Sequence, residues 1–278
     1  MKHIIRILYR TLCVTGLVSG AFLLLCCLGV VDPALLFQRE ETAVLQTAAP
    51  AELPAGEEAP EEKCLTLTAD QIDQAGARSA GYDAVLLPMQ NENGSLNYVS
   101  ALPLAVESGA SWGDPTRNES LRALNARADL HTAAEVSCLR DQILGQNDPA
   151  LFLRRVSGSP WRDGAGYGWL DPANDRVRAY LVGVCRELAD LGFDEIVLTH
   201  CAYPTEGAAA CLRPLGDKTG TLETLLRQIQ GAVADWGTEV SLRACPDADE
   251  AASASGQTAA LLAVGARVWD ADPGKFNE

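Results

Sequence analysis

One segment, residues 161–204, constrains the fold of this chain more than any other. Its sequence is WRDGAGYGWLDPANDRVRAYLVGVCRELADLGFDEIVLTHCAYP. Asp171 is a suitable N-cap residue and Pro172 a suitable first helical residue. Apolar residues then recur at helical spacing from Val177 to Leu188. Gly192 can adopt the positive φ that ends many helices. We therefore expect a helix that begins at Asp171-Pro172 and ends at Gly192.

The residues after this helix predict the type of sheet. Phe193–Leu198 is apolar, too short for a helix and bounded by turn residues, which is typical of a buried parallel strand. A helix that leads through a glycine turn into such a strand is half of a βαβ unit. Residues 199–204 then lie at the carboxyl end of a strand, where α/β folds hold their functional groups.

The rest of the folded region alternates strands with helices. We expect strands at residues 64–68, 82–89, 130–139, 194–200, 239–242 and 266–269, and further helices within 69–81, 118–128, 222–235 and 257–264. This alternation predicts an α/β fold with a parallel sheet. Because only six strands can be counted, we expect an open or incomplete (β/α) barrel with two unpaired edges.

The N-terminal residues have the pattern of a membrane anchor. Lys2, Arg6 and Arg10 precede the uncharged apolar stretch 12–31, which is long enough to span a bilayer. The positive flank predicts a cytoplasmic N-terminus and an extracytoplasmic domain. The alternative is a cleaved signal peptide, but the apolar stretch is long and no A-x-A site follows at once. We expect residues 1–31 to be a single-pass transmembrane anchor at the cell membrane.

Residues 32–63 are rich in Ala, Pro and Glu and lack apolar periodicity, which is typical of a solvated, disordered linker. The folded domain is then 64–278. The net charge of −15 disfavours nucleic acid as a partner, although much of this charge lies in the linker.

The same informative segment also carries a family resemblance. Trp169-Leu170-Asp171-Pro172 with Asn174, then Gly192-Phe193-Asp194-Glu195-Ile196, and finally Tyr203-Pro204 occur in this order. They resemble W-[VL]-D-P-x-N and G-F-D-E-I-Q-F-D-Y-[VI]-R-F-P of a glycoside hydrolase domain family of bacterial (β/α)8 barrels, usually secreted or membrane-anchored. The resemblance implies a TIM-barrel-like fold and a glycan ligand.

The departures from the family pattern fall on polar site residues. The family's Asp and Arg after the matching strand are Thr199 and Ala202 here, and its Arg on an earlier strand is Glu135. Scaffold residues are kept while site residues are lost. This favours a non-catalytic domain that binds envelope or extracellular glycan, including peptidoglycan. The alternative is an active glycoside hydrolase on a cell-wall or exopolysaccharide substrate with a rebuilt carboxylate pair.

Candidate site residues come from the expected carboxyl ends of the strands. Glycoside hydrolysis normally needs two carboxyl groups, and Asp141 and Glu92 are the nearest pair that the sequence offers, although no motif specifies them. Aromatic rings and a few polar groups are what carbohydrate binding needs. The candidate ligand-binding residues are Arg140, Trp161, Trp169, His200 and Tyr203. Alternatively, the aromatic rings close the barrel top, and Arg140 and His200 have structural roles.

No cofactor or metal ion is expected. The cysteine spacing matches no zinc pattern, and the motifs of nucleotide-binding proteins, serine hydrolases and zinc proteases are missing. Cys201 and Cys211 both follow the strand at 194–200 and could form a disulfide. Expected partners are a glycan, the membrane through residues 1–31, and a second copy of the chain that completes the barrel edge.

Overall fold

The computed structural model describes residues 63–205, 207–245, 254–266 and 268–269. They all fall within one compact unit, Pro60–Glu278. The predicted anchor at 1–31 and nearly all of the predicted linker lie outside the described residues. Within those residues, no helix combines the length and the apolar character that crossing a membrane requires.

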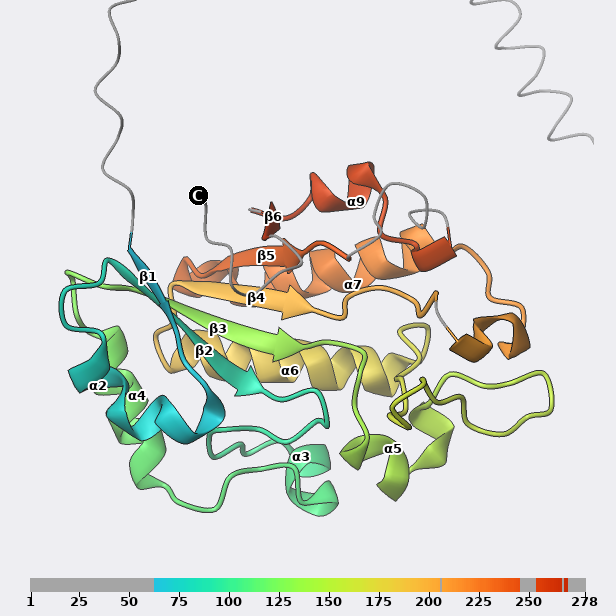
Figure 1. Cartoon of the computed structure of the whole chain (residues 1–278), viewed down its shortest axis with the longest axis horizontal. Coiled ribbons are helices and arrows are strands. Elements are labelled where there is room, and N and C mark those ends of the chain that lie inside the picture. The colour runs from blue at the N-terminus through green and yellow to red at the C-terminus, as the bar shows by residue number, and fades with distance from the viewer. Residues whose placement is uncertain (1–62, 206, 246–253, 267, 270–278) are drawn as a thin grey trace, which may run out of the picture. The chain divides into compact units, whose positions relative to one another are not determined.

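The described strands form one parallel sheet whose order in space is their order in the chain (Figure 1). The strands are β1 (Cys64–Thr66), β2 (Ala84–Gln90), β3 (His131–Ser137), β4 (Glu195–Thr199), β5 (Glu239–Arg243) and β6 (Val268–Trp269). Every neighbouring pair is parallel. The predicted α/β class with a parallel sheet is therefore confirmed, and each strand overlaps its predicted range.

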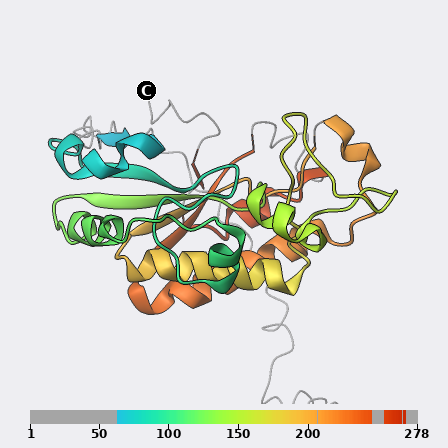
Figure 2. The same cartoon turned by 90° about the horizontal axis from the view of Figure 1, so that it is seen from below.

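The long helices cover one face of the sheet. Figures 1 and 2 show α6 (Asp175–Asp190) and α7 (Lys218–Val233) side by side on this face, and α4 (Thr116–Asn125) adds Leu121 and Leu124 to the same core. From β2, the side chains of Val85, Leu87 and Met89 point into this core, because alternate residues of a strand face the same side.

The start of α6 differs from the prediction, whereas its end agrees. Asn174 is the N-cap, because its side-chain oxygen accepts a hydrogen bond from the Arg176 amide at 2.9 Å. Asp171 accepts instead from the Ala173 amide at 2.9 Å and forms a turn before the helix. Pro172 lies in that turn and is not the first helical residue. Gly192 adopts φ 91° between α6 and β4, as predicted.

The opposite face of the sheet is largely polar. Its apolar part is a small buried cluster of Leu86, Ala133 and Val197. Glu135 is in register with Val197, so its side chain lies on this face. Arg243 of β5 reaches across β4 and donates from Nη2 to Glu135 Oε1 at 3.0 Å. A charged pair therefore occupies the face that the helices leave free.

Shorter elements connect the strands. They are the 3-10 helices η2 (Ala69–Gln74), η3 (Pro149–Leu151), η4 (Gly207–Cys211) and η5 (Ala234–Trp236), and the helices α2 (Ala75–Arg78), α3 (Pro103–Ser108), α5 (Ile143–Asn147) and α9 (Ala259–Leu262). The segment between β3 and α6 folds back on itself through antiparallel bridges that pair Phe152 with Leu170 and Arg162 with Gly168. Another bridge pairs Arg140 with Trp169, which brings this segment to the carboxyl ends of the strands.

Candidate functional site

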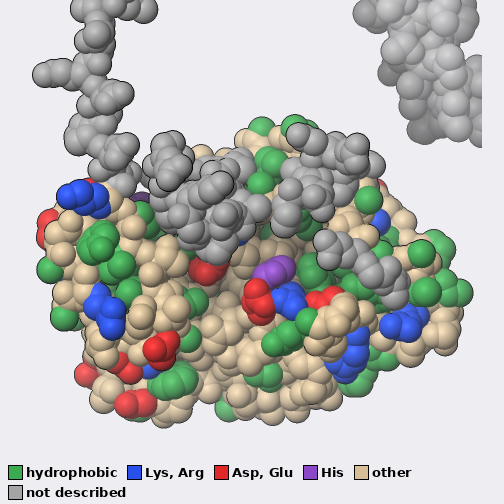
Figure 3. All heavy atoms as spheres, in the orientation of Figure 1, with side chains coloured by type: hydrophobic (Ala, Val, Ile, Leu, Met, Phe, Trp, Pro, Cys, Tyr) green, Lys and Arg blue, Asp and Glu red, His purple; other side chains and the backbone are tan. Residues whose placement is uncertain are grey.

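Six ionisable side chains gather near the carboxyl ends of β2, β3, β4 and β5, and we call them the strand-end cluster. They are Glu92, Glu135, Arg140, Asp163, His200 and Arg243. Figure 3 shows acidic, basic and histidine side chains together near the centre of the face that it draws. Because parallel strands end at the same edge of a sheet, residues far apart in the sequence meet here.

Arg140 is the central cation of the strand-end cluster. Its Nε donates to Asp163 Oδ2 at 2.8 Å, and its guanidinium lies over the Tyr167 ring, 4.2 Å from the ring centre. On another side it donates to Glu92, whose side chain is exposed. Two contacts thus fix the guanidinium plane, and the third is made with a side chain that solvent reaches.

Asp163 holds Arg140 in place and is itself tightly held. It accepts hydrogen bonds from Trp169 Nε1 at 3.2 Å and from the amides of Ala165 and Tyr167 at 3.0 and 2.9 Å. Burial raises the pKa of Asp163, but the bonds from Trp169, Tyr167 and Arg140 together outweigh it, so the pKa lies below its usual value. Asp163 is therefore an ionised anchor for Arg140.

His200 directly follows β4 and has a backbone conformation that few residues other than glycine adopt. Its φ of 50° is in the left-handed region, and it is the one described residue other than glycine with positive φ. Its Nδ1 lies 3.2 Å from Ser137 Oγ, which donates its proton to the Arg140 carbonyl at 3.0 Å. Ser137 must therefore accept from Nδ1, which leaves Nε2 as the acceptor in the neutral ring.

The outer nitrogen of His200 faces Glu92. Nε2 lies 3.9 Å from Glu92 Oε1. Burial lowers the pKa of His200, while the charge of Glu92 opposes this effect and that of Arg140 adds to it. The Trp169 ring meets the imidazole edge to face, with ring centres 5.8 Å apart. Glu92 thus lies between a fixed guanidinium and an oriented imidazole, and the imidazole packs against the Trp169 ring.

Glu135 and Arg243 complete the cluster on the polar face of the sheet. Burial raises the pKa of Glu135, against the opposing effect of the Arg243 guanidinium, and repulsion from Glu92 raises it slightly further. The sequence reasoning missed Glu135, Asp163 and Arg243 as site residues. One signal was present for Glu135, because it is the one carboxylate within the strand His131–Ser137.

Asp141 does not join the cluster, which corrects its pairing with Glu92. Its side chain is fully buried and accepts from the Leu144 amide at 2.9 Å and from Gln90 Nε2 at 3.3 Å. A Cβ at Gly94 would overlap its carboxyl group. Burial raises the pKa of Asp141 to about 7. Arg140 turns to the cluster and Asp141 to the interior, so Asp141 organises the chain before α5.

Two of the three predicted aromatic residues are also buried. Trp161 is 0% exposed and Tyr203 is 3% exposed, so neither ring offers a face to a sugar. Trp169 is only partly buried, and it contacts both Trp161, at 6.3 Å between ring centres, and His200. The alternative that aromatic rings close the interior therefore describes Trp161 and Tyr203, while Trp169 remains at the cluster.

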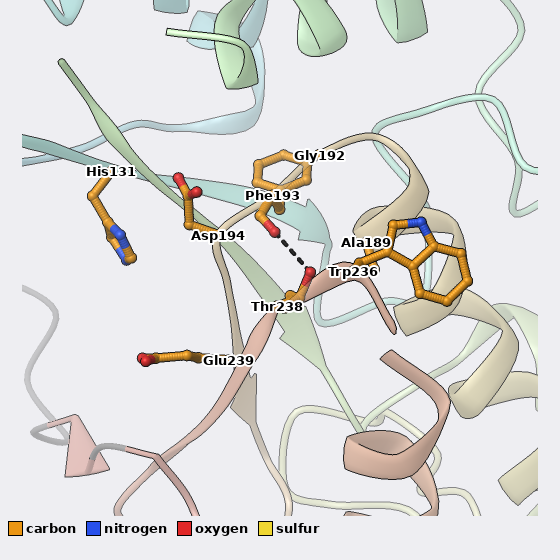
Figure 4. Close-up of a pocket in the computed structure, with 9 residues that line it drawn as sticks. His131, Ala189, Gly192, Phe193, Asp194, Trp236, Thr238 and Glu239 are labelled. Atoms are coloured by element: carbon orange, nitrogen blue, oxygen red, sulfur yellow. Dashed lines mark hydrogen bonds between the residues drawn. The ribbon is translucent and has the colours of Figure 1, made fainter. Parts of the chain in front are cut away.

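A cavity of about 380 Å³ lies at the opposite ends of the strands (Figure 4). His131, Asp194, Trp236 and Glu239 line it, and Thr238 donates to the Phe193 carbonyl at 2.9 Å beside it. Asp194 also accepts from the Thr132 amide at 2.8 Å, which ties β3 to β4. Amino ends of parallel strands are usually a stability face, which agrees with the structural role of Asp194 between β3 and β4.

The described part of the chain bears on the expectations for metal ligands and for the cysteine pair. No group of three His, Cys, Asp or Glu side chains there could hold a metal ion. The six cysteines in the same residues are free, including Cys201 and Cys211, so the candidate disulfide between these two is not formed.

The fold and the cluster define an α/β domain with a charged, aromatic-flanked group of residues at its strand ends. The chain belongs to the family described as "Putative glycosyl hydrolase domain", whose model matches residues 69–242. This confirms the family resemblance of the segment around Asp171 and Gly192. No curated protein matches the sequence.

One solved structure shows a similar fold, and two glycosidase structures match at lower scores. A hypothetical protein from Ruminiclostridium thermocellum matches with TM-score 0.56 at 22% identity, over 64% of this chain and 96% of that one. A GH20 exo-β-N-acetylglucosaminidase from Vibrio harveyi has TM-score 0.49 at 12% identity, over 66% of this chain and 35% of its own. An α-galactosidase from Thermus thermophilus has TM-score 0.46 at 13% identity, over 66% and 38%.

Proposed function

We propose that this chain is a glycan-binding domain of the glycosyl hydrolase family that does not hydrolyse its ligand. One observation carries the proposal: each carboxylate of the strand-end cluster is bound by an arginine. Arg140 binds both Asp163 and Glu92, and Arg243 binds Glu135. At the family's carboxylate position, Thr199 has only a hydroxyl, which donates to the Val136 carbonyl at 3.3 Å.

Hydrolysis of a glycosidic bond requires two carboxyl groups in different states, and the carboxyl groups at the strand ends do not readily provide them. One carboxyl group must be protonated near the leaving oxygen, and a second must be free to attack or to activate water. Asp163 is held ionised by four donors, and Asp141 is buried away from solvent. The remaining two carboxylates, Glu92 and Glu135, are each engaged in an ion pair with an arginine.

Binding of a sugar chain needs less than hydrolysis. Sugar hydroxyl groups can donate to His200 Nε2 and to the carboxylate of Glu92, and can accept from Arg140. The partly exposed ring of Trp169 offers an apolar surface next to these groups. Polar groups that converge beside an aromatic ring at the carboxyl ends of strands support a glycan site.

We also propose that the sheet is an open form of a (β/α) barrel. The parallel strands follow one another in chain order, and long helices cover one face only. The other face carries the pair of Glu135 and Arg243, as the inside of a barrel would. A second copy of the chain that completes the sheet edge remains part of this proposal.

The location is proposed from the sequence alone. Residues 1–31 would anchor the chain in the cell membrane, and 32–63 would hold the domain at the outer side. The ligand would then be a glycan of the cell envelope or its surroundings, such as peptidoglycan or an exopolysaccharide.

A second function, active hydrolysis by a rebuilt pair, is favoured by Glu135. Its pKa is raised by burial, as a general acid requires, and Glu92 is exposed nearby and close enough to add to that shift. The pair would be Glu135 as acid and Glu92 as base or nucleophile, in place of Asp141 and Glu92.

One experiment separates binding from hydrolysis. The purified full-length chain in detergent is incubated with peptidoglycan and with acidic and neutral polysaccharides, and both retention on the polymer and release of reducing ends are measured. The proposal expects retention without release. Release that Glu135→Gln abolishes would establish the rebuilt pair, and absence of retention on every polymer would contradict the binding function.

A further inference from the structure

We infer that the strand-end cluster binds the carboxylate of an acidic sugar, such as a uronic acid, and that Glu92 occupies the place of this carboxylate in the unbound chain. The inference rests on the proposed glycan-binding function and names the ligand class of the same site. It depends on how Arg140, Glu92 and His200 are arranged.

Arg140 is prepared for a planar anion. Its Nε is bound by Asp163, and its flat face rests on Tyr167. A guanidinium group that is fixed in this way loses little freedom when a carboxylate binds. The side chain is 14% exposed, so solvent screens such a contact only in part. A fixed, partly buried guanidinium is a better partner for a carboxylate than for a neutral hydroxyl group.

Glu92 resembles a ligand group more than a structural one. Its carboxylate contacts Arg140 with one oxygen and lies 3.9 Å from His200 Nε2 with the other. Its side chain is 58% exposed, whereas Asp163 on the other side of Arg140 is 17% exposed. Solvent reaches the Glu92 side of this ion pair and weakens it, so a ligand carboxylate can displace Glu92 from Arg140.

The surroundings fit a sugar that carries this carboxylate. The Trp169 ring lies next to His200, so a pyranose ring could rest on it while the carboxylate of the sugar reaches Arg140. In the neutral form that its contact with Ser137 favours, His200 accepts a sugar hydroxyl at Nε2. A neutral sugar that displaced Glu92 would offer the Arg140 guanidinium only a hydroxyl oxygen in place of a carboxylate, which is a weaker acceptor.

The test compares acidic and neutral tetrasaccharides on the full-length chain by titration calorimetry at low salt. A galacturonic acid tetramer should bind at least about tenfold more tightly than cellotetraose, because it gains a charge-assisted contact. Glu92→Gln removes the competing carboxylate and should tighten acid binding up to about fivefold. Glu107→Gln, at an exposed position on α3, is the matched control and should change neither affinity.

Replacement of the Arg140 guanidinium should weaken binding of the acidic ligand, whereas Glu92→Gln should tighten it. Arg140→Lys should weaken binding of the acidic tetramer about tenfold or more and that of cellotetraose much less. Because Arg140 also binds Asp163, the melting temperature of the Arg140→Lys variant is compared with that of the parent chain. A second measurement needs no variant: raising NaCl from about 0.05 to about 0.5 M should weaken only the acidic ligand.

The outcomes distinguish this inference from the proposed function. Equal affinities for the two tetramers, or weaker acid binding by Glu92→Gln, would overturn the inference while leaving glycan binding intact. Failure of acidic and neutral glycans alike to bind would overturn both.

Discussion

At the scale of single residues, Asp141 is a carboxyl group whose surroundings favour the neutral form. It is fully buried and its pKa is raised to about 7. Its neighbour Gln90 has a buried Oε1 without a hydrogen-bond partner among the described residues. Rotation of the Gln90 amide would let a protonated Asp141 donate to this oxygen, because amide orientation is assigned from the hydrogen-bond network. A neutral Asp141 thus avoids a buried negative charge and also gives the buried Gln90 Oε1 a hydrogen-bond donor.

The free energy of unfolding should therefore depend on pH through Asp141. Between about pH 4 and pH 7 the unfolded chain ionises this group while the folded chain keeps its proton, so rising pH favours unfolding. The raised pKa of Asp141 can change the free energy of unfolding by about 4 kcal/mol at most over this pH range. Urea unfolding of the parent and of Asp141→Asn should show the parent losing stability relative to the variant across this range. A pH-independent difference would mean that Asp141 is ionised in the folded chain.

Tyr203 and Trp169 should respond differently to truncation. Tyr203 is buried, so Tyr203→Ala should lower the free energy of unfolding by about 3–5 kcal/mol. Trp169 is only partly buried, so Trp169→Ala should cost less stability but reduce retention on glycan. Thermal melting and polymer pull-down of both variants check this. A stable Tyr203→Ala that loses glycan retention would return Tyr203 to the binding site.

Residue roles were the hardest part to predict from the sequence. Arg140 and His200 were placed at the strand ends by their position after strands, and Trp169 was chosen as an aromatic residue of the loop before the helix at 175–190; the structure brings the three together. Asp141 was misplaced because sequence position alone does not say which of two neighbouring residues points inwards. Trp161 and Tyr203 were misplaced because an aromatic residue in a loop has the same sequence pattern whether it seals the interior or faces solvent.

At the scale of elements, the Phe152 ring joins α5 to the segment that carries Trp169. A Cβ on either Gly145 or Gly168 would overlap this ring, and Phe152 is 1% exposed. The two glycines therefore allow the segment between β3 and α6 to fold tightly over the strand ends. The position of Asp163 and Trp169 beside Arg140 depends on this packing.

Alanine at either glycine should destabilise this segment. Gly145→Ala and Gly168→Ala should each lower the free energy of unfolding by about 1–3 kcal/mol, as overpacking of a core does. Gly231→Ala is the matched control, because it lies on the exposed side of α7 with no atom near its Cβ position. That control should be stabilised by up to about 1 kcal/mol. Chemical unfolding measures all three, and unchanged stability of both buried variants would contradict the packing argument.

Long elements were predictable, and short ones were not. The helix after Asn174 and the strand at Glu195–Thr199 have clear periodicity, so both were expected near their observed limits. The predicted start of α6 was too early because Asp171 and Asn174 are both good N-cap residues, and only the backbone shows which one is used. Helices α3 and α5 have six and five residues, too few to show a period.

At the scale of the whole molecule, the proposed topology can be tested directly. If residues 1–31 span the membrane with the domain outside, protease added to intact cells should cut within 32–63 and release the domain. Immunodetection of the released fragment measures this, with a cytoplasmic protein as the control for lysis. Protection of the domain until the cells are lysed would show that the orientation is wrong.

The strand-end cluster is a property of the whole sheet. Arg243 and Glu135 lie 108 residues apart in the chain and meet across β4. Their contact depends on the register of three strands, which periodicity within each strand does not determine. The sequence could thus predict the class of sheet and the edge that carries polar groups, whereas the partners of each carboxylate required the assembled fold.

The lengths of the outer strands bear on how copies of this domain behave at high concentration. Among the described strands, β1 has three residues and β6 has two, while β2 and β3 inside the sheet have seven each. A short outer strand offers few backbone groups for a second chain to extend, so it gives aggregation little to grow from. β1 is therefore a poor template for runaway strand addition, and a second copy that completes the sheet edge would need side-chain contacts as well as backbone pairing to stay bound.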